Sequence, residues 1–227
     1  GDARSVAGYP ENMAGESLYM ISWGEHIPNP EYDTELFSVV VVTNVGDTNL
    51  YISGASFEYE NIDGGLLEIA EYAKSIPDVI APGEDAYIYS TVYFDSPEAL
   101  EEVYDMVPRL TIYKTSAEAK YLSVSDVSIS RDGYSTRVIG RLTNDTDVTV
   151  SSYATVGVFF LDTEGYLMYI DYTFPSKDLA PGETAAFEYS TYDSSFIPEE
   201  EIGDCVFIVQ DSYWGYAEYE LATEVSW

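Results

Sequence analysis

The sequence predicts an all-β protein made of two tandem antiparallel β-sandwiches. The chain repeats itself at a spacing of about 100 residues, and a repeat of that length is domain-sized, so each copy can close its own apolar core. Short β-branched and aromatic runs are separated by turn signals about every 8–12 residues, which is typical of sandwiches. The chain has 227 residues, of which 46% are hydrophobic and 15% aromatic, enough apolar material for two cores.

Three short motifs define the repeat, because they recur in the same order with a nearly constant offset. We expect a flexible leader over residues 1–16, a first sandwich over 17–120 and a second over 121–227. The recurring motifs are Thr43-Asn44 with Thr143-Asn144, residues 80–84 (Ile-Ala-Pro-Gly-Glu) with 179–183 (Leu-Ala-Pro-Gly-Glu), and residues 89–91 with 189–191 (both Tyr-Ser-Thr).

The individual elements follow from local composition. One short helix is expected near residues 96–104, because Ser96 is a good N-cap, Pro97 fits the first helical position and glutamates fill the first turn. Residues 196–201 hold the equivalent place in the second copy. The clearest β-rich segments are 37–42, 86–94 and 156–161, and segments 66–75 and 166–172 are also expected to be strands.

The two copies differ most near their first strands. Arg131-Asp132-Gly133 predicts a tight hairpin in the second copy, whereas the first copy is expected to have a long loop over residues 24–35. No Gly-, Pro- or Ser-rich spacer separates the copies, so we expect a boundary near residues 120–126 and a fairly stiff, monomeric two-module arm.

The charge balance excludes one class of partner. Nine Lys plus Arg oppose 41 Asp plus Glu, and the net charge of −32 is spread over the whole chain. Such a surface repels phosphate groups, so we expect no nucleic-acid binding. The acids are expected to keep the protein soluble, with attraction of cations or of a basic partner as the alternative. No run of about 18 apolar residues occurs, so this segment is not expected to insert into a membrane. No signal peptide is visible, and any signal or lipid anchor is expected to have been removed.

The second copy resembles the FxLYD domain family, over roughly residues 121–225. The matching segments are residues 140–146 (Gly-Arg-Leu-Thr-Asn-Asp-Thr), 158–165 (Val-Phe-Phe-Leu-Asp-Thr-Glu-Gly) and 179–183 with Phe187. The first copy keeps only the Ala-Pro-Gly-Glu turn well, and a different immunoglobulin-like subtype remains open for it. The resemblance implies immunoglobulin-like sandwiches in a bacterial extracellular setting, on surface proteins or lipoproteins, and it supplies no catalytic residues.

Groups that carry chemistry are scarce, so we expect no enzyme activity and no cofactor. His26 is the single histidine, and Cys205 is the single cysteine, placed in an apolar run where a buried structural role is expected. Calcium is the one metal worth considering, with Asp145 and Asp147 as weak candidates, although no complete calcium-loop pattern occurs.

Aromatic residues give the best binding signal. Tyr213, Trp214 and Tyr216 form a dense group that can stack on sugar rings or anchor a protein, with core packing or cover for a sheet edge as the alternative. Trp23, His26 and Tyr32, in and beside the predicted loop of the first copy, are weaker candidates.

These observations predict a non-catalytic, extracellular structural, adhesion or ligand-presenting arm of a bacterial cell-surface protein or lipoprotein. Its partner is expected to be a protein or a cell-wall or glycan component. The alternative is a carbohydrate-binding module that uses the aromatic residues of the C-terminal hairpin.

Overall fold

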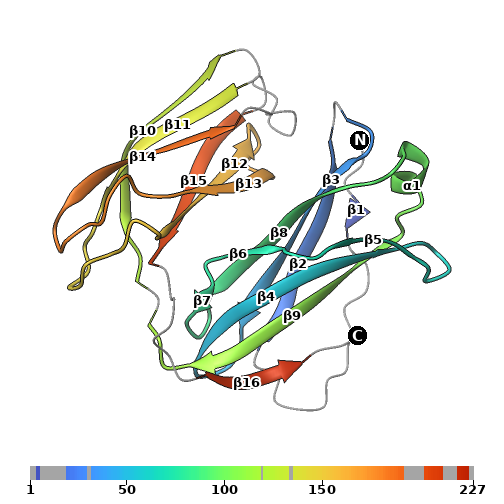
Figure 1. The fold of residues 1–227 in the computed structure, drawn as a ribbon, viewed down its shortest axis with the longest axis horizontal. Helices are drawn as coiled ribbons and strands as arrows, with labels where there is room; N and C mark the ends of the chain where they lie inside the picture. Colours follow the sequence, from blue (N-terminus) through green and yellow to red (C-terminus); the bar gives the residue numbers. More distant parts are fainter. Residues whose placement is uncertain are drawn as a thin grey trace. The chain divides into compact units, whose positions relative to one another are not determined.

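The computed structural model describes residues 4–5, 19–29, 32–118, 120–132, 135–191, 202–211 and 219–224. Within these ranges the chain is all-β, with four antiparallel sheets and one short helix (Figure 1). Contacts divide it into two compact units, the first of residues 1–118 with 216–227 and the second of residues 119–215. Each unit holds two of the sheets, which confirms the predicted all-β, sandwich-like fold class. In these ranges no helix has the length and apolar character needed to cross a bilayer.

The first sheet of unit 1 is organised around β3 (Glu35–Asn44), whose side chains are buried at nearly every position. β3 is a central strand, paired with β2 on one side and with β8 on the other. The order is β1-β2-β3-β8-β6, with β1 (Arg4–Ser5), β2 (Tyr19–Pro28), β8 (Asp85–Tyr93) and β6 (Lys74–Ile76).

The second sheet of unit 1 has the order β16-β9-β4-β5, and β7 also pairs with β4. Its alternating burial places Phe57, Tyr59 and Met106 in the core between the two sheets. The strands are β4 (Asn49–Glu60), β5 (Leu66–Ala70), β7 (Val79–Ile80), β9 (Asp105–Thr115) and β16 (Tyr219–Glu224).

The predicted helix of the first copy is confirmed as α1 (Pro97–Glu101). Ser96 is its N-cap, and the Ser96 hydroxyl accepts a hydrogen bond of 3.3 Å from the Ala99 N–H. Its counterpart, residues 196–201, lies outside the described residues.

Unit 2 repeats this plan with two three-stranded sheets, ordered β10-β11-β14 and β13-β12-β15. Its buried residues, among them Val158, Phe160 and Phe187, form the interior of this unit. The strands are β10 (Ser123–Asp132), β11 (Ser135–Thr143), β12 (Thr155–Asp162), β13 (Leu167–Thr173), β14 (Thr184–Thr191) and β15 (Ile202–Gln210).

The repeated Asn and Pro-Gly-Glu motifs form the same hydrogen-bonded clasp in both units. The buried Asn144 amide donates to the carbonyls of Val148 at 2.7 Å and Leu179 at 2.8 Å, and Asn44 donates to those of Thr48 and Ile80 at 2.9 and 3.0 Å. The clasp therefore ties the end of one strand to a segment about 35 residues further along, which explains why the motifs recur together.

The turn that faces each clasp needs its glycine. Gly83 and Gly182 have φ values of 84° and 77°, a region that residues with a side chain rarely adopt. The N–H groups of these two glycines donate to the Asn44 and Asn144 carbonyls, both at 2.8 Å. The following Glu183 carboxylate accepts from the Ala180 N–H at 2.9 Å and closes the turn.

Three expectations differ from the structure. The loop predicted over residues 24–35 is wrong in its first part, because β2 continues in register to Pro28, where it pairs with Leu36, and only residues 29–34 connect the strands. The leader predicted over residues 1–16 contains β1, since Arg4 and Ser5 pair with His26 and Glu25 of β2.

The third difference concerns the last strand. Residues 121–227 were expected to form one module, but β16 pairs with β9, with Tyr219 opposite Thr115. The last described strand therefore belongs to unit 1, although it follows unit 2 in the chain.

Candidate functional site

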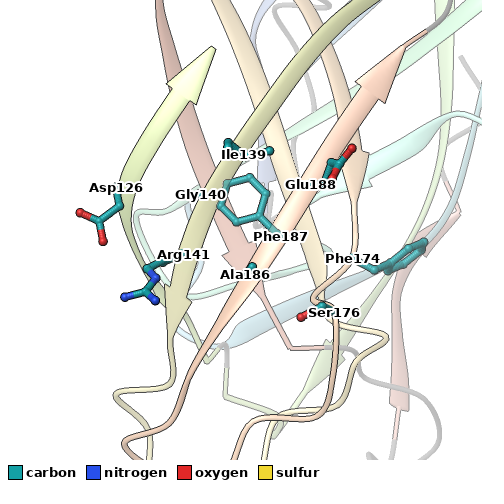
Figure 2. Close-up of a pocket in the computed structure, with 9 residues that line it drawn as sticks. All are labelled: Asp126, Ile139, Gly140, Arg141, Phe174, Ser176, Ala186, Phe187 and Glu188. Atoms are coloured by element: carbon teal, nitrogen blue, oxygen red, sulfur yellow. The ribbon is translucent and has the colours of Figure 1, made fainter. Parts of the chain in front are cut away.

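A shallow hollow of about 560 Å³ lies on the outer face of the β10-β11-β14 sheet of unit 2. Figure 2 shows Asp126 and Arg141 on the β10 side of the hollow, and Phe174 and Ser176 beyond β14 on the other side. The lining residues are Asp126, Ile139, Gly140, Arg141, Phe174, Ser176, Ala186, Phe187 and Glu188.

A β-bulge shapes one wall of the hollow. The register between β10 and β11 shifts between Ser125 and Ser128, so two residues of β10, Asp126 and Val127, lie opposite the single residue Gly140. Asp126 has a φ of 52°, a left-handed conformation that Asp tolerates better than most residues. The bulge therefore changes the direction of the β10 backbone at the rim of the hollow.

Gly140 and Phe187 form the floor of the hollow, and the Phe187 ring fits only because Gly140 has no side chain. They are directly opposite in the β11–β14 register, and a Cβ at Gly140 would lie 2.6 Å from Phe187 Cε1. The absence of a side chain at Gly140 thus leaves space for the Phe187 ring between the two strands (Figure 2). Their contact gives both positions a packing role.

The charged groups of the hollow differ in whether they form ion pairs within the protein. Arg137 makes a two-pronged ion pair with Glu188, at 2.8 Å from Nε to Oε1 and 2.8 Å from Nη2 to Oε2, and this ion pair holds the pKa of the Glu188 carboxyl below its usual range. The Arg141 side chain makes no hydrogen bond or ion pair with any other described residue. Its guanidinium is therefore available to a ligand beside the exposed apolar side chains of Ile139 and Phe174.

The candidates of the first copy do not form a common site in the described structure. Trp23 and His26 lie within β2, opposite Val41 and Ser38, rather than in or beside a loop. Their side chains are outside the described part of the chain. Tyr32 does lie in the short β2–β3 connection, where it is exposed and its N–H donates to Asn29 Oδ1 at 3.2 Å.

The other aromatic candidates, Tyr213, Trp214 and Tyr216, fall outside the described residues, so the binding role predicted for them stays a prediction. The calcium candidates both contact protein groups: Asp145 accepts a hydrogen bond from the Ser123 hydroxyl, and Asp147 lies 3.3 Å from Lys120 Nζ. Among the described residues, no group of three or more His, Cys, Asp or Glu is placed to hold a metal ion.

Two buried groups in unit 2, the Cys205 thiol and the Tyr189 hydroxyl, have a strongly raised pKa. Burial, with a smaller contribution from Asp204, raises the pKa of the Cys205 thiol to about 12, which fits the structural role expected for it. Burial also raises the pKa of Tyr189, and its hydroxyl donates to Asp171 Oδ2 at 3.0 Å. Both groups stay neutral near pH 7.

Sequence reasoning missed the hollow, because its residues come from four segments that fold together. Gly140 and Arg141 stand in a motif segment, but nothing in the sequence links them to Asp126 or Phe174. The available signal was the single glycine in an otherwise regular strand, which often marks a bulge or a close approach.

Comparison with known proteins does not identify this chain. No family model matches it and no curated protein matches it, so the resemblance to the FxLYD family stays a prediction. Among solved structures, the secreted serine protease VesC from Vibrio cholerae aligns with 82% of this chain and 47% of its own length, at 9% sequence identity and a TM-score of 0.22. The alignment thus spans less than half of that protein.

Proposed function

We propose that this chain is a non-catalytic, extracellular arm of a bacterial cell-surface protein or lipoprotein, and that its second unit presents a binding surface to a cell-wall component. The observation that carries the proposal is the hollow on the outer face of the β10-β11-β14 sheet. Three of its four lining segments lie on β10, β11 and β14, whose register is fixed by pairing. The fourth, residues 174–176, is tied to β14 by the bridge between Pro175 and Phe187 and by the hydrogen bond of 3.2 Å from the Ser176 N–H to the Ala186 carbonyl, so the site is formed before a ligand arrives.

The chemistry of the hollow indicates the kind of ligand. Arg141 provides an unengaged guanidinium, which suits a carboxylate. Phe174, which is 45% exposed, provides an aromatic surface for a sugar ring or an apolar group. Peptidoglycan combines sugar rings with carboxylate-bearing stem peptides, and it therefore presents both features close together.

Cosedimentation with purified, insoluble peptidoglycan tests this proposal. We expect the wild-type chain to sediment with the polymer, and Arg141→Ala and Phe174→Ala each to weaken binding about tenfold, which corresponds to about 1.4 kcal/mol. Tyr153→Ala is the matched control, because Tyr153 is also an exposed aromatic residue of unit 2 and lies outside the hollow.

Retention of the wild-type chain on neutral polysaccharide alone would favour the carbohydrate-binding alternative instead. The proposal is wrong if peptidoglycan does not retain the wild-type chain, or if the two hollow variants bind as well as the control.

A further inference from the structure

Strand β15 has an open edge in the part of unit 2 that the structure describes. The sheet order is β13-β12-β15, so β12 covers one side of β15. On the other side, residues 120–122 are the only described ones that lie alongside, and they reach only the C-terminal end of β15. Tyr121 bridges Gln210, and the Leu122 N–H donates to the Val209 carbonyl at 3.1 Å. From Ile202 to Ile208 no described strand covers this edge.

The groups on the open edge follow from the alternation of the strand. The Val209 carbonyl faces this edge, so the backbone groups of Phe207 and Cys205 face it as well. The Cys205 N–H donates to its neighbour Asp204 Oδ1 at 2.7 Å, which satisfies one edge donor locally. The N–H and carbonyl of Phe207 have no hydrogen-bond partner among the described residues and can pair with an added strand.

The equivalent edge of unit 1 shows what a protected version looks like. Residues 105–110 of β9 (Asp-Met-Val-Pro-Arg-Leu) align with residues 204–209 of β15 (Asp-Cys-Val-Phe-Ile-Val). The alignment is supported by a shared hydrogen bond, because the Met106 N–H donates to Asp105 Oδ1 at 2.8 Å, just as Cys205 does to Asp204.

The two copies differ at positions 108 and 109 of β9, which align with positions 207 and 208 of β15, and both differences protect the edge of unit 1. Pro108 takes the place of Phe207 and removes the N–H that an added strand would use. Arg109 takes the place of Ile208 and is held by Glu58 at 2.7 Å, which puts charge beside the edge. Proline and charge are the usual devices that prevent edge-to-edge pairing, and this stretch of β15 has neither at these positions.

We propose that the open edge of β15 binds an extended segment of a partner protein, which adds to the β13-β12-β15 sheet as a further antiparallel strand. Main-chain hydrogen bonds to Phe207 would hold the segment, and its alternate apolar side chains would pack beside Val206, which is 46% exposed, and Ile208. This site is on the other sheet of unit 2 from the hollow, so the inference does not depend on the proposed function.

Charge determines the kind of segment that fits. Asp204 lies on the edge, and the chain carries −32 overall. A segment with Lys or Arg at its ends is therefore favoured, since oppositely charged cross-strand neighbours stabilise pairing. The same charge disfavours a second copy of this chain as the occupant, because two strongly acidic surfaces would have to approach each other.

The probe for this proposal is the peptide Lys-Val-Thr-Val-Thr-Val-Lys, blocked at both ends, with Glu-Val-Thr-Val-Thr-Val-Glu as the charge-reversed control. Fluorescence anisotropy measures binding to the full chain, and hydrogen exchange of the segment 202–210 locates it. We expect the lysine peptide to bind about tenfold more tightly than the glutamate peptide and to slow exchange of the Phe207 amide.

Three variants make the test specific. Ile208→Arg and Phe207→Pro install the residues of the protected copy, and each should weaken peptide binding at least about tenfold. Because Phe207 packs against Phe187, at 5.5 Å between ring centroids, Phe207→Pro can disturb folding, and Ile208→Arg is then the decisive variant. Asp204→Lys should reduce the preference for the lysine peptide over the glutamate peptide.

The proposal is overturned if the lysine peptide does not bind, if Ile208→Arg leaves its affinity unchanged, or if protection appears outside the segment 202–210. Concentration-dependent dimerisation that protects this segment in the absence of peptide would also overturn it, by showing that a second copy occupies the edge.

Discussion

The packing of Gly140 against Phe187 predicts a strong coupling between these two positions. The equivalent register pair in unit 1 is Val40 opposite Ile88, both buried in the core of that unit. Unit 2 therefore combines no side chain with a large ring, where unit 1 combines two medium-sized side chains. We infer that stability is largely kept when both residues of a pair are replaced together by those of the other unit, and is lost when only one residue is replaced.

The magnitudes follow from the geometry. Gly140→Val places a Cβ at 2.6 Å from Phe187 Cε1, and overpacking of this kind costs about 3 kcal/mol. Phe187→Ile leaves a cavity beside Phe207 and costs about 2 kcal/mol. The double variant restores the pairing of unit 1, so we expect a loss of only about 2 kcal/mol, which corresponds to a coupling energy of about 3 kcal/mol.

Urea unfolding of the full chain measures these losses of stability, with hydrogen exchange in the segments 135–143 and 184–191 as the readout for unit 2. The control is the reciprocal change in unit 1, Val40→Gly with Ile88→Phe, which should show the same sign of coupling in the exchange of residues 35–44. Simple additivity of the two single changes in unit 2 would refute this reasoning.

Three further predictions follow from the structure. Asn144→Ala removes the amide that donates to two carbonyls in the clasp, so it should destabilise unit 2 by about 2–4 kcal/mol, and Asn44→Ala should destabilise unit 1 by the same amount. Urea unfolding, with hydrogen exchange measured separately for each unit, checks both values. The raised pKa of Tyr189 means that folding favours its neutral form, so its contribution is complete below about pH 10 and falls as the pH rises further; Tyr189→Phe should flatten this alkaline loss of melting temperature. With 41 acidic and nine basic residues, the chain should melt at a higher temperature in 1 M than in 0.05 M sodium chloride, and an unchanged melting temperature would show that its carboxylates do not repel one another appreciably.

Local features of this fold could be predicted from the sequence because local chemistry determines them. The α1 start follows from Ser96 and Pro97, and the turns at Gly83 and Gly182 follow from a backbone conformation that glycine accepts. The duplication itself was visible because the clasp needs the same residues in each unit.

Pairings between distant segments could not be predicted in this way. The composition of β16 is compatible with several sheet edges, and nothing local to residues 219–224 specifies β9. The extension of β2 to Pro28 was hidden because proline and glycine usually indicate a loop, although proline is tolerated at the end of a strand. The hollow combines residues from 126 to 188, and only the folded sheet shows that they are neighbours.

The pairing of β16 with β9 has a consequence for biosynthesis. A ribosome releases the chain from its N-terminal end, so residues 119–215 emerge completely before residues 219–224 can reach Thr111–Thr115. The earlier half of the protein therefore receives its last described strand after the later half has had the opportunity to fold. Removing residues 219–227 should consequently weaken the half that is synthesised first and spare the half that directly precedes the deletion.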